Sequence, residues 1–193
     1  MRELQQPASD PFFPASPVGP ALETARLILR QNRLSDLEDR IAITDDPDFM
    51  RFVGGVYDRQ ENWARLMRYI GHWACLGFGL FAVEEKGTGR YVGNVGLARF
   101  ERGLGEDFDP FPEGAWMVAQ WAEGQGYATE AMSAALDWYD RQFGPGRQVC
   151  IIDPANRASL RLAGKLGFRR YREGMNRGHT VFLHERNASP HGQ

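Results

Sequence analysis

The fold is decided by one stretch of the sequence, Val118-Ala119-Gln120-Trp121-Ala122-Glu123-Gly124-Gln125-Gly126-Tyr127-Ala128-Thr129-Glu130-Ala131. A strand pattern ends in this stretch, a glycine turn follows, and a helix begins. Gly124 and Gly126 have no Cβ atom, so several backbone N–H groups can point into one concavity without a steric clash. The first N–H groups of a helix have no partner within the helix and carry a partial positive charge. The turn therefore predicts a binding site for a phosphate or pyrophosphate group.

The spacing of the glycines separates this turn from two common phosphate-binding loops. The loop of nucleoside triphosphatases needs a Lys-Ser or Lys-Thr pair after its last glycine, and no such pair follows Gly126. A Rossmann dinucleotide loop needs a further glycine three residues later, where this chain has Thr129. Both loops are disfavoured. Taken alone, the two glycines are also compatible with a turn that binds nothing.

Length and composition indicate one globular domain. The chain has 193 residues, of which 42% are hydrophobic and 25% are charged, which is ordinary for a folded domain with a substantial core. Its formal net charge of -2 gives no basic stripe for a nucleic-acid backbone, so we expect no nucleic-acid partner. No apolar run approaches the roughly 18 to 20 residues of a membrane span, so we expect no membrane partner. The N-terminus lacks the basic and apolar regions of a secretory signal, which predicts a cytoplasmic protein.

Metal and disulfide sites are not indicated. Cys75 and Cys150 lie in apolar surroundings without the spacing of a disulfide or metal motif, so they are predicted to be free thiols in the core. The four histidines and the carboxylates are irregularly placed, so we expect no metal ligand set.

The pattern of apolar residues predicts one domain over residues 22–186. It lies between a Pro-rich tail at residues 1–21 and a polar tail at residues 187–193. Helices are expected at 35–44, with Ser35 as N-cap, at 128–143, at 157–166, and over a stretch that buries Trp63, Leu66, Met67, Ile70 and Trp73 or Ala74. Strands are expected at 26–30, 77–85, 91–100, 114–119, 148–152, 168–172 and 179–184, the last two joined by a turn at 174–178. The strand, helix and strand from 114 to 152 predict parallel pairing of 114–119 with 148–152.

Three stretches together resemble the GCN5-related N-acetyltransferase (GNAT) superfamily, in particular its ribosomal-protein-acetyltransferase-like (RimJ/RimL-type) branch. They are Arg26-Leu27-Ile28-Leu29-Arg30, the stretch from Val118 to Ala131, and Asn156-Arg157-Ala158-Ser159-Leu160 through Gly167-Phe168. The resemblance implies a mixed α+β fold in a single domain, with a central, mostly antiparallel, splayed β-sheet flanked by helices. It also implies an acetyl-CoA-dependent N-acetyltransferase, in which a primary amine attacks the thioester directly in a ternary complex. The acceptor would be a small molecule or a protein N-terminus or lysine, and a homodimer is compatible with the resemblance.

The resemblance assigns cofactor-binding roles to particular residues. Val118 would offer backbone hydrogen bonds to the pantetheine arm, and the N–H groups from Glu123 through Thr129 would hold the pyrophosphate. Asn156 and Ser159 would flank the thiol end. The full implied set for acetyl-CoA is Met117, Val118, Glu123, Gly124, Gln125, Gly126, Tyr127, Ala128, Thr129, Asn156 and Ser159.

Two positions depart from the family pattern. Glu123 stands where relatives have Arg or Gln, and its acidic side chain is unhelpful beside phosphates. Because the main chain makes most of the expected contacts, we expect weaker affinity or an outward side chain rather than loss of binding. Ala163 stands where many relatives have a tyrosine that protonates the leaving thiolate. The proton must then come from water or from another side chain.

Glu113 is the first candidate for the general base, because it begins the strand that leads to the cofactor. The alternative is a solvated loop glutamate. Asp153 is the second candidate, and a role in the turn before Pro154 competes with catalysis there. His72 and His179 titrate near neutral pH and are weaker candidates.

The acidic segment 101–113 suggests the nature of the acceptor. If it borders the acceptor site, it would attract a cationic amine, and the alternative is a solvated loop. Trp116 and Tyr127 are candidates for lining the acceptor channel, with packing as the alternative. Two other functions stay open: a catalytically inactive acyl-CoA-binding sensor, because of Ala163, and a transferase for a larger acyl-CoA.

Overall fold

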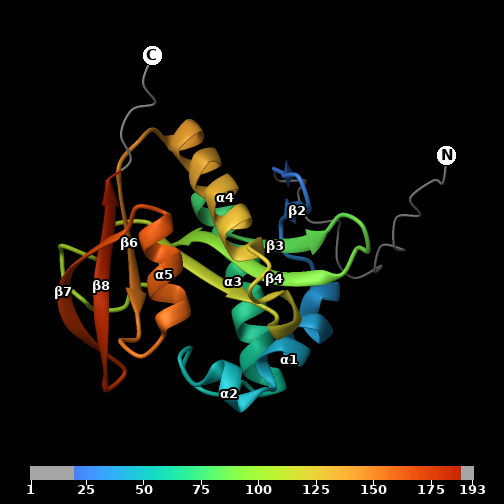
Figure 1. Cartoon of the computed structure of the whole chain (residues 1–193), viewed down its shortest axis with the longest axis horizontal. Coiled ribbons are helices and arrows are strands. Elements are labelled where there is room, and N and C mark those ends of the chain that lie inside the picture. Colours follow the sequence, from blue (N-terminus) through green and yellow to red (C-terminus); the bar gives the residue numbers. More distant parts are fainter. Residues whose placement is uncertain (1–19, 188–193) are drawn as a thin grey trace.

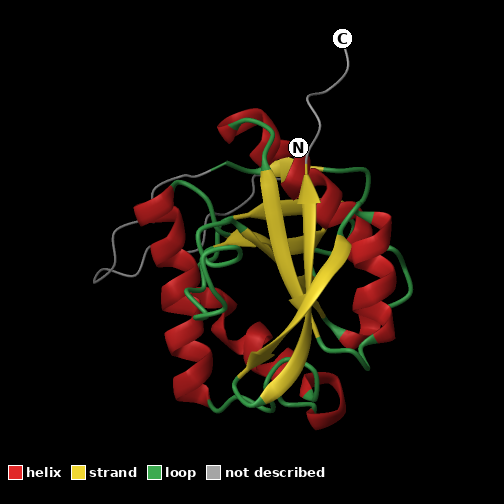
Figure 2. Ribbon diagram, turned by 90° about the vertical axis from the view of Figure 1, so that its left-hand side faces the viewer, coloured by secondary structure: helices red, strands yellow, loops and turns green. Residues whose placement is uncertain are grey.

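The computed structural model describes residues 20–187, and the predicted tails outside this range, at residues 1–19 and 188–193, are not described. The strands are β1 (Leu22–Glu23), β2 (Leu27–Arg30), β3 (Leu80–Glu85), β4 (Tyr91–Ala98), β5 (Glu113–Val118), β6 (Arg147–Ile152), β7 (Arg169–Asn176) and β8 (His179–Asn187). The helices are α1 (Leu37–Thr44), α2 (Pro47–Met50), α3 (Arg59–Leu76), α4 (Tyr127–Phe143) and α5 (Arg157–Lys165), with 3-10 turns at Leu34–Asp36 and Gln120–Ala122. Helices lie on both sides of the strands (Figure 2), which confirms the predicted α+β class.

One sheet carries all the strands, in the order β1-β2-β3-β4-β5-β6-β8-β7. Every neighbouring pair is antiparallel except β5 with β6, so the sheet is mostly antiparallel, as expected. The hairpin of β3 and β4 has the predicted turn between residues 86 and 89. In Figure 1, β6 and β8 turn away from β3 and β4 on either side of α4.

The sheet splays apart between β5 and β6. The two strands are parallel, as predicted, but they pair only at Glu113 and Val149, so the predicted extent of pairing was wrong. Beyond this pair the side chain of Trp116 reaches Ser159 of α5, with 3.1 Å between its Nε1 and the serine Oγ. Phe168 packs against Trp116 with 6.4 Å between ring centroids. Beyond Glu113 and Val149, β5 pairs only with β4 and β6 only with β8, which leaves the facing strand edges apart.

Helix α4 packs on the sheet through small and apolar side chains. Ala131, Met132, Ala135 and Leu136 are buried and belong to the main core, together with residues of β2, β3 and β4. Their spacing of three and four residues is the period of a helix with one buried face. The packing places the N-terminal end of α4 against the end of β5, at the mouth of the splay.

Helix α3 begins and ends at strong caps. Asp58 and Glu61 form a reciprocal capping box, and Gly77 ends the helix in the left-handed conformation at φ 72°. The predicted buried face was partly wrong. Trp63 and Ala74 are exposed, whereas the buried positions are Asn62, Leu66, Tyr69 and Trp73. Asn62 is buried because its amide donates to Thr44 Oγ1 of α1 and to the Tyr57 carbonyl, a long-range pairing that hydrophobic periodicity does not register.

Three boundaries also differ from the sequence analysis. Ser35 does not cap α1, because Asp36 accepts the Arg33 N–H and thereby closes the preceding 3-10 turn. The β7–β8 turn is tighter than 174–178: β7 continues to Asn176, which pairs with His179. Asn187 was placed in the polar tail, but it pairs with Arg147 at the end of β8.

Candidate active site

Two cavities adjoin at the opening between β5 and β6. The turn cavity, of about 590 Å³, lies beside the glycine turn and the start of α4. The arginine cavity, of about 820 Å³, is lined by Arg40, Arg51, Arg65, Arg68, Arg102 and Arg177 among other residues. Both volumes fall within the roughly 300–1,000 Å³ typical of small-molecule sites. The cavities share the lining residues Arg51, Phe52, Val53, Trp116, Met117, Asn156 and Ser159.

The turn cavity collects nearly all of the predicted cofactor-binding residues. Its lining includes Met117, Val118, Glu123, Gly124, Gly126, Tyr127, Ala128, Thr129, Asn156 and Ser159. Gln125 is the exception: its amide donates to the Trp121 carbonyl at 2.7 Å, which turns the side chain back over the turn.

The glycine turn presents open main-chain donors. Gly124 and Gly126 have φ of 71° and 81°, a left-handed conformation that other residues adopt only with strain. Gly126 is the N-cap of α4, and no side chain caps the helix. Within the described residues, the N–H groups of Gly124, Gly126, Tyr127, Ala128 and Thr129 have no hydrogen-bond acceptor, and the N–H of Glu130 is the first in α4 to be bonded, to the Gly126 carbonyl at 3.0 Å. The Glu123 N–H differs, because it donates to the Gln120 carbonyl at 3.1 Å, and the predicted run of free donors therefore begins one residue later.

Arg26 holds the turn from behind. Its Nη1 donates to the Gln125 carbonyl at 2.9 Å, while its Nε and Nη2 both lie 2.7 Å from Glu130 Oε2 in α4. Glu130 Oε1 accepts the Arg26 N–H at 2.9 Å and the Thr24 hydroxyl at 2.5 Å. Because the Gln125 carbonyl is drawn outward, the neighbouring N–H groups are left facing the cavity. Arg26 and Glu130 were quoted in the family resemblance, but their pairing joins positions about a hundred residues apart and was not predicted.

The side chains of Tyr127 and Glu123 point in different directions. The Tyr127 ring is buried, its hydroxyl donates to Glu85, and Arg26 stacks on it at 4.4 Å, so this side chain does not line the arginine cavity. These contacts are those of the packing alternative for Tyr127, which lines the turn cavity. Glu123 is exposed, and Arg161 and Lys165 line the same cavity and offset its charge.

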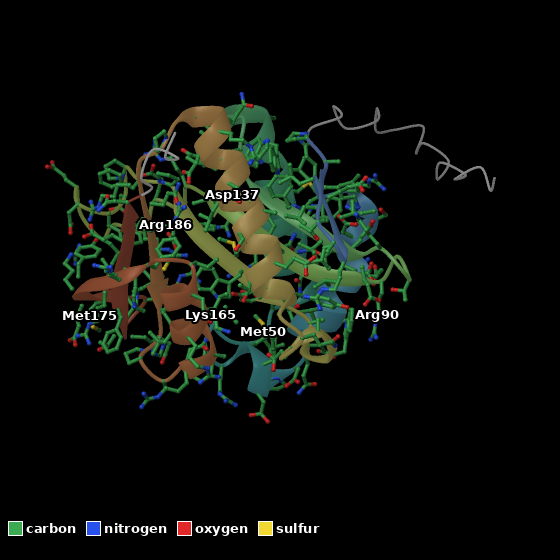
Figure 3. The ribbon with its side chains drawn as sticks, turned by 45° about the horizontal axis from the view of Figure 1, so that its top comes forward. Met50, Arg90, Asp137, Lys165, Met175 and Arg186 are labelled. Atoms are coloured by element: carbon green, nitrogen blue, oxygen red, sulfur yellow. The ribbon has the colours of Figure 1, made fainter. Side chains whose placement is uncertain are left out.

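Helix α5 contributes a hydroxyl at the junction of the cavities. Asn156 caps the helix, with its Oδ1 accepting the Ser159 N–H at 3.0 Å. Ser159 Oγ accepts from Trp116 Nε1 and keeps its own hydrogen for donation. Ala163 lies one turn later and is fully buried. Figure 3 shows the side chains of this region, with Lys165 on α5 and Met50 on α2 labelled.

Glu113 lies at the vertex of the splay and lines the arginine cavity. It is only 3% exposed, so the alternative of a solvated loop glutamate was wrong. Both of its carboxylate oxygens accept from Arg102 Nε, at 2.9 and 2.7 Å. Burial raises the pKa of Glu113 above its ordinary value, and the ion pair with Arg102 opposes that rise. A buried carboxylate of raised pKa that faces a cavity can accept a proton.

The other predicted bases are less suitably placed. Asp153 lines the arginine cavity, but its Oδ1 accepts the Ala155 N–H at 2.7 Å, which is the turn role considered for it. His179 lines the same cavity and is exposed. His72 lines neither cavity and packs edge-on against Phe100, and burial lowers its pKa.

The acidic segment does not present free carboxylates to the arginine cavity. Asp107 is held by Arg172, whose Nε and Nη2 each lie 2.8 Å from a carboxylate oxygen, and this pairing lowers the pKa of Asp107. Asp109 accepts the N–H groups of Arg102 and Gly105. Neither aspartate lines the cavity, and the two carboxylates of the segment that do line it, Glu101 and Glu113, are paired with Arg99 and Arg102. The expected attraction of a cationic acceptor by this segment therefore has no support in the geometry.

Within residues 20–187, no group of three or more His, Cys, Asp or Glu side chains is arranged to hold a metal ion. None of the helices in that part of the chain is long and apolar enough to cross a membrane. Cys75 and Cys150 are both free thiols, but only Cys150 is buried; Cys75 is exposed on α3, so its predicted place in the core was wrong.

Comparisons with known proteins agree on one family. Residues 26–169 match the family model described as "Acetyltransferase (GNAT) domain". The chain is 32% identical over 155 residues to the uncharacterized protein YkkB of Bacillus subtilis, a match that covers 74% of this chain and 84% of YkkB.

Solved structures are similar over most of the chain. A putative GnaT-family acetyltransferase from Bordetella pertussis is 33% identical with a TM-score of 0.78, covering 86% of this chain and 99% of that one. A RimL ribosomal L7/L12 alpha-N-protein acetyltransferase, solved in complex with coenzyme A, shares the fold at a TM-score of 0.68 and 16% identity. That match covers 90% of this chain and 97% of RimL.

Proposed function

Since this chain belongs to the GNAT acetyltransferase family and is an N-acetyltransferase, we propose that it transfers the acetyl group of acetyl-CoA to a primary amine. The observation that carries the proposal is the row of open N–H groups from Gly124 to Thr129 in the turn cavity. Such a row at a helix N-terminus suits a pyrophosphate. Its position at the mouth of the splay, next to a second cavity, provides separate places for the acyl donor and the acceptor.

The donor set of the turn cavity fits the chemical parts of acetyl-CoA. Main-chain N–H groups and the start of α4 would hold the pyrophosphate, with Arg161 and Lys165 adding positive charge. The free edge of β5 at Val118 faces the splay and would hydrogen-bond the pantetheine amides. When bound, acetyl-CoA supplies a thioester carbonyl as the acyl donor.

Glu113 is proposed as the general base. An amine nucleophile must lose a proton before or during attack, and Glu113 is the buried carboxylate in the lining of the arginine cavity. Its raised pKa makes it a stronger base than an exposed glutamate. The proton moves to a Glu113 carboxylate oxygen directly or through one water molecule.

Ser159 is proposed to stabilise the leaving thiolate at the place where relatives use a tyrosine. Ser159 and Ala163 are four residues apart on α5, so they lie on the same face of the helix. Trp116 Nε1 donates to the serine oxygen, which leaves the hydroxyl hydrogen to donate a hydrogen bond to the leaving sulfur. The thiolate then takes its proton from water, and the serine keeps its own.

Calorimetry with acetyl-CoA, followed by a thiol-release assay over a panel of amines, tests the proposed function. Binding at micromolar concentration with amine-dependent thiol release is the expected result. Binding without release for any amine would favour an acyl-CoA sensor and contradict the proposed chemistry. Faster turnover with succinyl-CoA than with acetyl-CoA would contradict the proposed acyl group. Absence of binding would contradict the assignment of the turn cavity.

A further inference from the structure

The lining of the arginine cavity has more positive than negative charge. Six arginines line it, against three carboxylates, Glu101, Glu113 and Asp153. Glu113 is paired with Arg102, and Glu101 with Arg99, which lies outside the lining. Among the described residues, Arg51 reaches only the exposed Asp48 at 3.7 Å, and no ion pair involves Arg40, Arg65, Arg68 or Arg177. The cavity therefore has positive charge that the described part of the chain does not neutralise.

Arg40 is the most unusual member of this group. It is fully buried, and only its Nη1 has a partner, the Asn94 Oδ1 on β4. Its Nε and Nη2 are buried without a hydrogen-bond partner among the described residues, although the guanidinium stacks on Tyr69 at 4.7 Å. A buried guanidinium without a carboxylate is costly, and orphaned donors add to that cost. We expect such a guanidinium in a cavity wall where a bound ligand supplies the missing hydrogen-bond acceptors.

The other arginines converge on the same space from different elements. Arg65 and Arg68 come from α3, and Arg177 comes from the β7–β8 turn. Arg65 stacks on the Tyr57 ring at 3.7 Å. Burial lowers the pKa of Arg65, and the nearby charges of Arg68 and Arg177 lower it further, which shows that like charges gather here. Arg177 and Gly178 form the two-residue β7–β8 turn with φ of 52° and 82°, as a tight hairpin turn requires, and this turn carries Arg177 into the cavity lining.

This charge has two consequences for an acceptor. A polyamine or another polycation would meet like charge, which opposes binding. An amine that also bears a carboxylate or phosphate would place that anion on the guanidinium groups, which bind oxyanions through paired N–H donors. The same positive field favours the neutral form of the amine, which is the nucleophilic form.

We infer that the acceptor is a small primary amine that carries a carboxylate or phosphate group, bound by Arg40, Arg65, Arg68 and Arg177, with its amine directed toward Glu113. This inference rests on the proposed acetyl transfer and names the substrate class of the same site. It replaces the cationic acceptor that the acidic segment suggested, because Asp107 and Asp109 lie outside the cavity, and Glu101 and Glu113, which line it, are each paired with an arginine.

Matched pairs of amines test the charge requirement. The panel compares free amino acids with their amides, phosphoethanolamine with ethanolamine, and both with spermidine. We expect kcat/KM to be at least about tenfold higher for the anionic member of a pair, and to fall as salt screens the interaction. Carboxylate and phosphate pairs identify which anion is used. Faster acetylation of spermidine or of the amides would overturn the inference, as would a preference for peptide N-termini regardless of anionic charge.

Variants then connect the preference to the cavity. Arg68→Gln and Arg65→Gln should raise KM for the anionic amine about tenfold and leave KM for acetyl-CoA unchanged. Arg177→Asn should do the same, because asparagine tolerates positive φ. Arg141→Gln removes the same charge from the exposed end of α4, outside both cavities, and should change neither KM. Equal effects of Arg141→Gln and Arg68→Gln would contradict a local role for the cluster.

A binding assay separates failure of this inference from failure of the proposed function. If no amine is acetylated but anionic amines raise the melting temperature of the wild-type protein in the presence of coenzyme A, the proposed function fails and the anion site stands. That stabilisation should be lost in Arg68→Gln and kept in Arg141→Gln. If neutral amines are acetylated while anionic amines neither react nor stabilise the protein, the inference fails and the proposed function stands.

Discussion

The turn cavity and the arginine cavity adjoin at Trp116 and Ser159, but they are built in different ways. The turn cavity uses main-chain N–H groups of consecutive residues, and two glycines in the left-handed conformation set their direction. The arginine cavity uses side chains from α1, α3, β5 and the β7–β8 turn. A site made of consecutive backbone groups tolerates changes in most side chains, whereas a site made of distant side chains changes with each of them. The first is suited to a shared cofactor and the second to a particular acceptor.

Gly126→Leu is expected to have the largest effect on acetyl-CoA binding, because it disrupts the glycine turn from which the turn cavity is built. The substitution forces a branched side chain into φ 81°, beside Arg26, and turns the N–H groups away from the cavity. Calorimetry should detect no acetyl-CoA binding at concentrations that saturate the wild type. Gly77→Leu is the matched control, since Gly77 is left-handed at φ 72°, ψ 3° and lines neither cavity. Equal loss of binding in both variants would mean that backbone strain, not the anion site, is responsible.

Glu113→Gln should have the second largest effect, and it should lower the rate of acetyl transfer without weakening cofactor binding. Loss of a general base predicts a fall in kcat of roughly a hundredfold with an unchanged Kd for acetyl-CoA. The base works when deprotonated, so wild-type kcat/KM should rise with pH through the pKa of Glu113. Because burial raises that pKa, this limb should lie above the ordinary range of glutamate, and it should vanish in the variant. Asp153→Asn serves as the comparison, and a larger effect there would reassign the base.

Ser159→Ala tests one of the residues that line both cavities. We expect kcat to fall about tenfold, because water can replace part of the hydrogen bonding to the leaving sulfur, while the Kd of acetyl-CoA changes little. Ser133→Ala on α4, which lines neither cavity, should leave kcat unchanged. An unchanged kcat in Ser159→Ala under conditions where chemistry limits the rate would remove the serine from the mechanism.

Arg26→Ala tests how far the turn cavity depends on a side chain. The substitution removes the contacts of Arg26 with the Gln125 carbonyl and Glu130 and leaves the N–H groups of the turn in place. The Arg26 side chain is 45% exposed, so the pair with Glu130 should matter more for geometry than for stability. We expect the Kd of acetyl-CoA to rise about threefold and the melting temperature to shift little. Arg59→Ala breaks the exposed Arg59–Glu38 pair and is the control. A Kd for acetyl-CoA that rises no more in Arg26→Ala than in Arg59→Ala would show that the turn keeps its shape without Arg26.

Asp107→Asn should have the smallest effect on catalysis. Asp107 lines neither cavity, so KM for the acceptor and for acetyl-CoA should stay within error. Its pKa is lowered by Arg172, so the pair stabilises the fold above the unfolded-state pKa and loses this contribution as pH falls through the folded-state pKa. Thermal unfolding at neutral and acidic pH should therefore differ between wild type and variant only at neutral pH. A raised acceptor KM would restore the acidic segment as a substrate-binding feature.

Local patterns were sufficient for most elements and for one cavity. The period of α4, the turn of the β3–β4 hairpin and the αL glycine after α5 depend on residues close in sequence, and each was predicted. The failures were long-range. Asn62 is buried on α3 because it meets Thr44 of α1, and Asp36 closes its turn instead of leaving Ser35 to cap α1. Hydrophobic periodicity cannot register a polar residue whose partner comes from another helix.

The charge of segment 101–113 shows the same limit. Its carboxylates lie within thirteen residues of one another in the sequence, yet one of their partners, Arg172, comes from a position about sixty residues away. The arginines of the arginine cavity are scattered from Arg40 to Arg177 and gave no motif. Net charge along a segment does not report the field at a site, because that field depends on which side chains are brought together.

The sequence by itself determined the anion-binding turn. A pair of glycines, a helix start and a strand end are local properties, and they were sufficient to predict an anion site, while three stretches taken together predicted the family. Only the tertiary structure decided the arginine cavity. It placed Glu113 at the vertex of the splay, left Arg40 buried without a carboxylate, and paired Asp107 with Arg172 outside the cavity. Backbone conformation is set within a few residues, whereas the charge and shape of a cavity are sums over side chains that only folding brings within reach of one another.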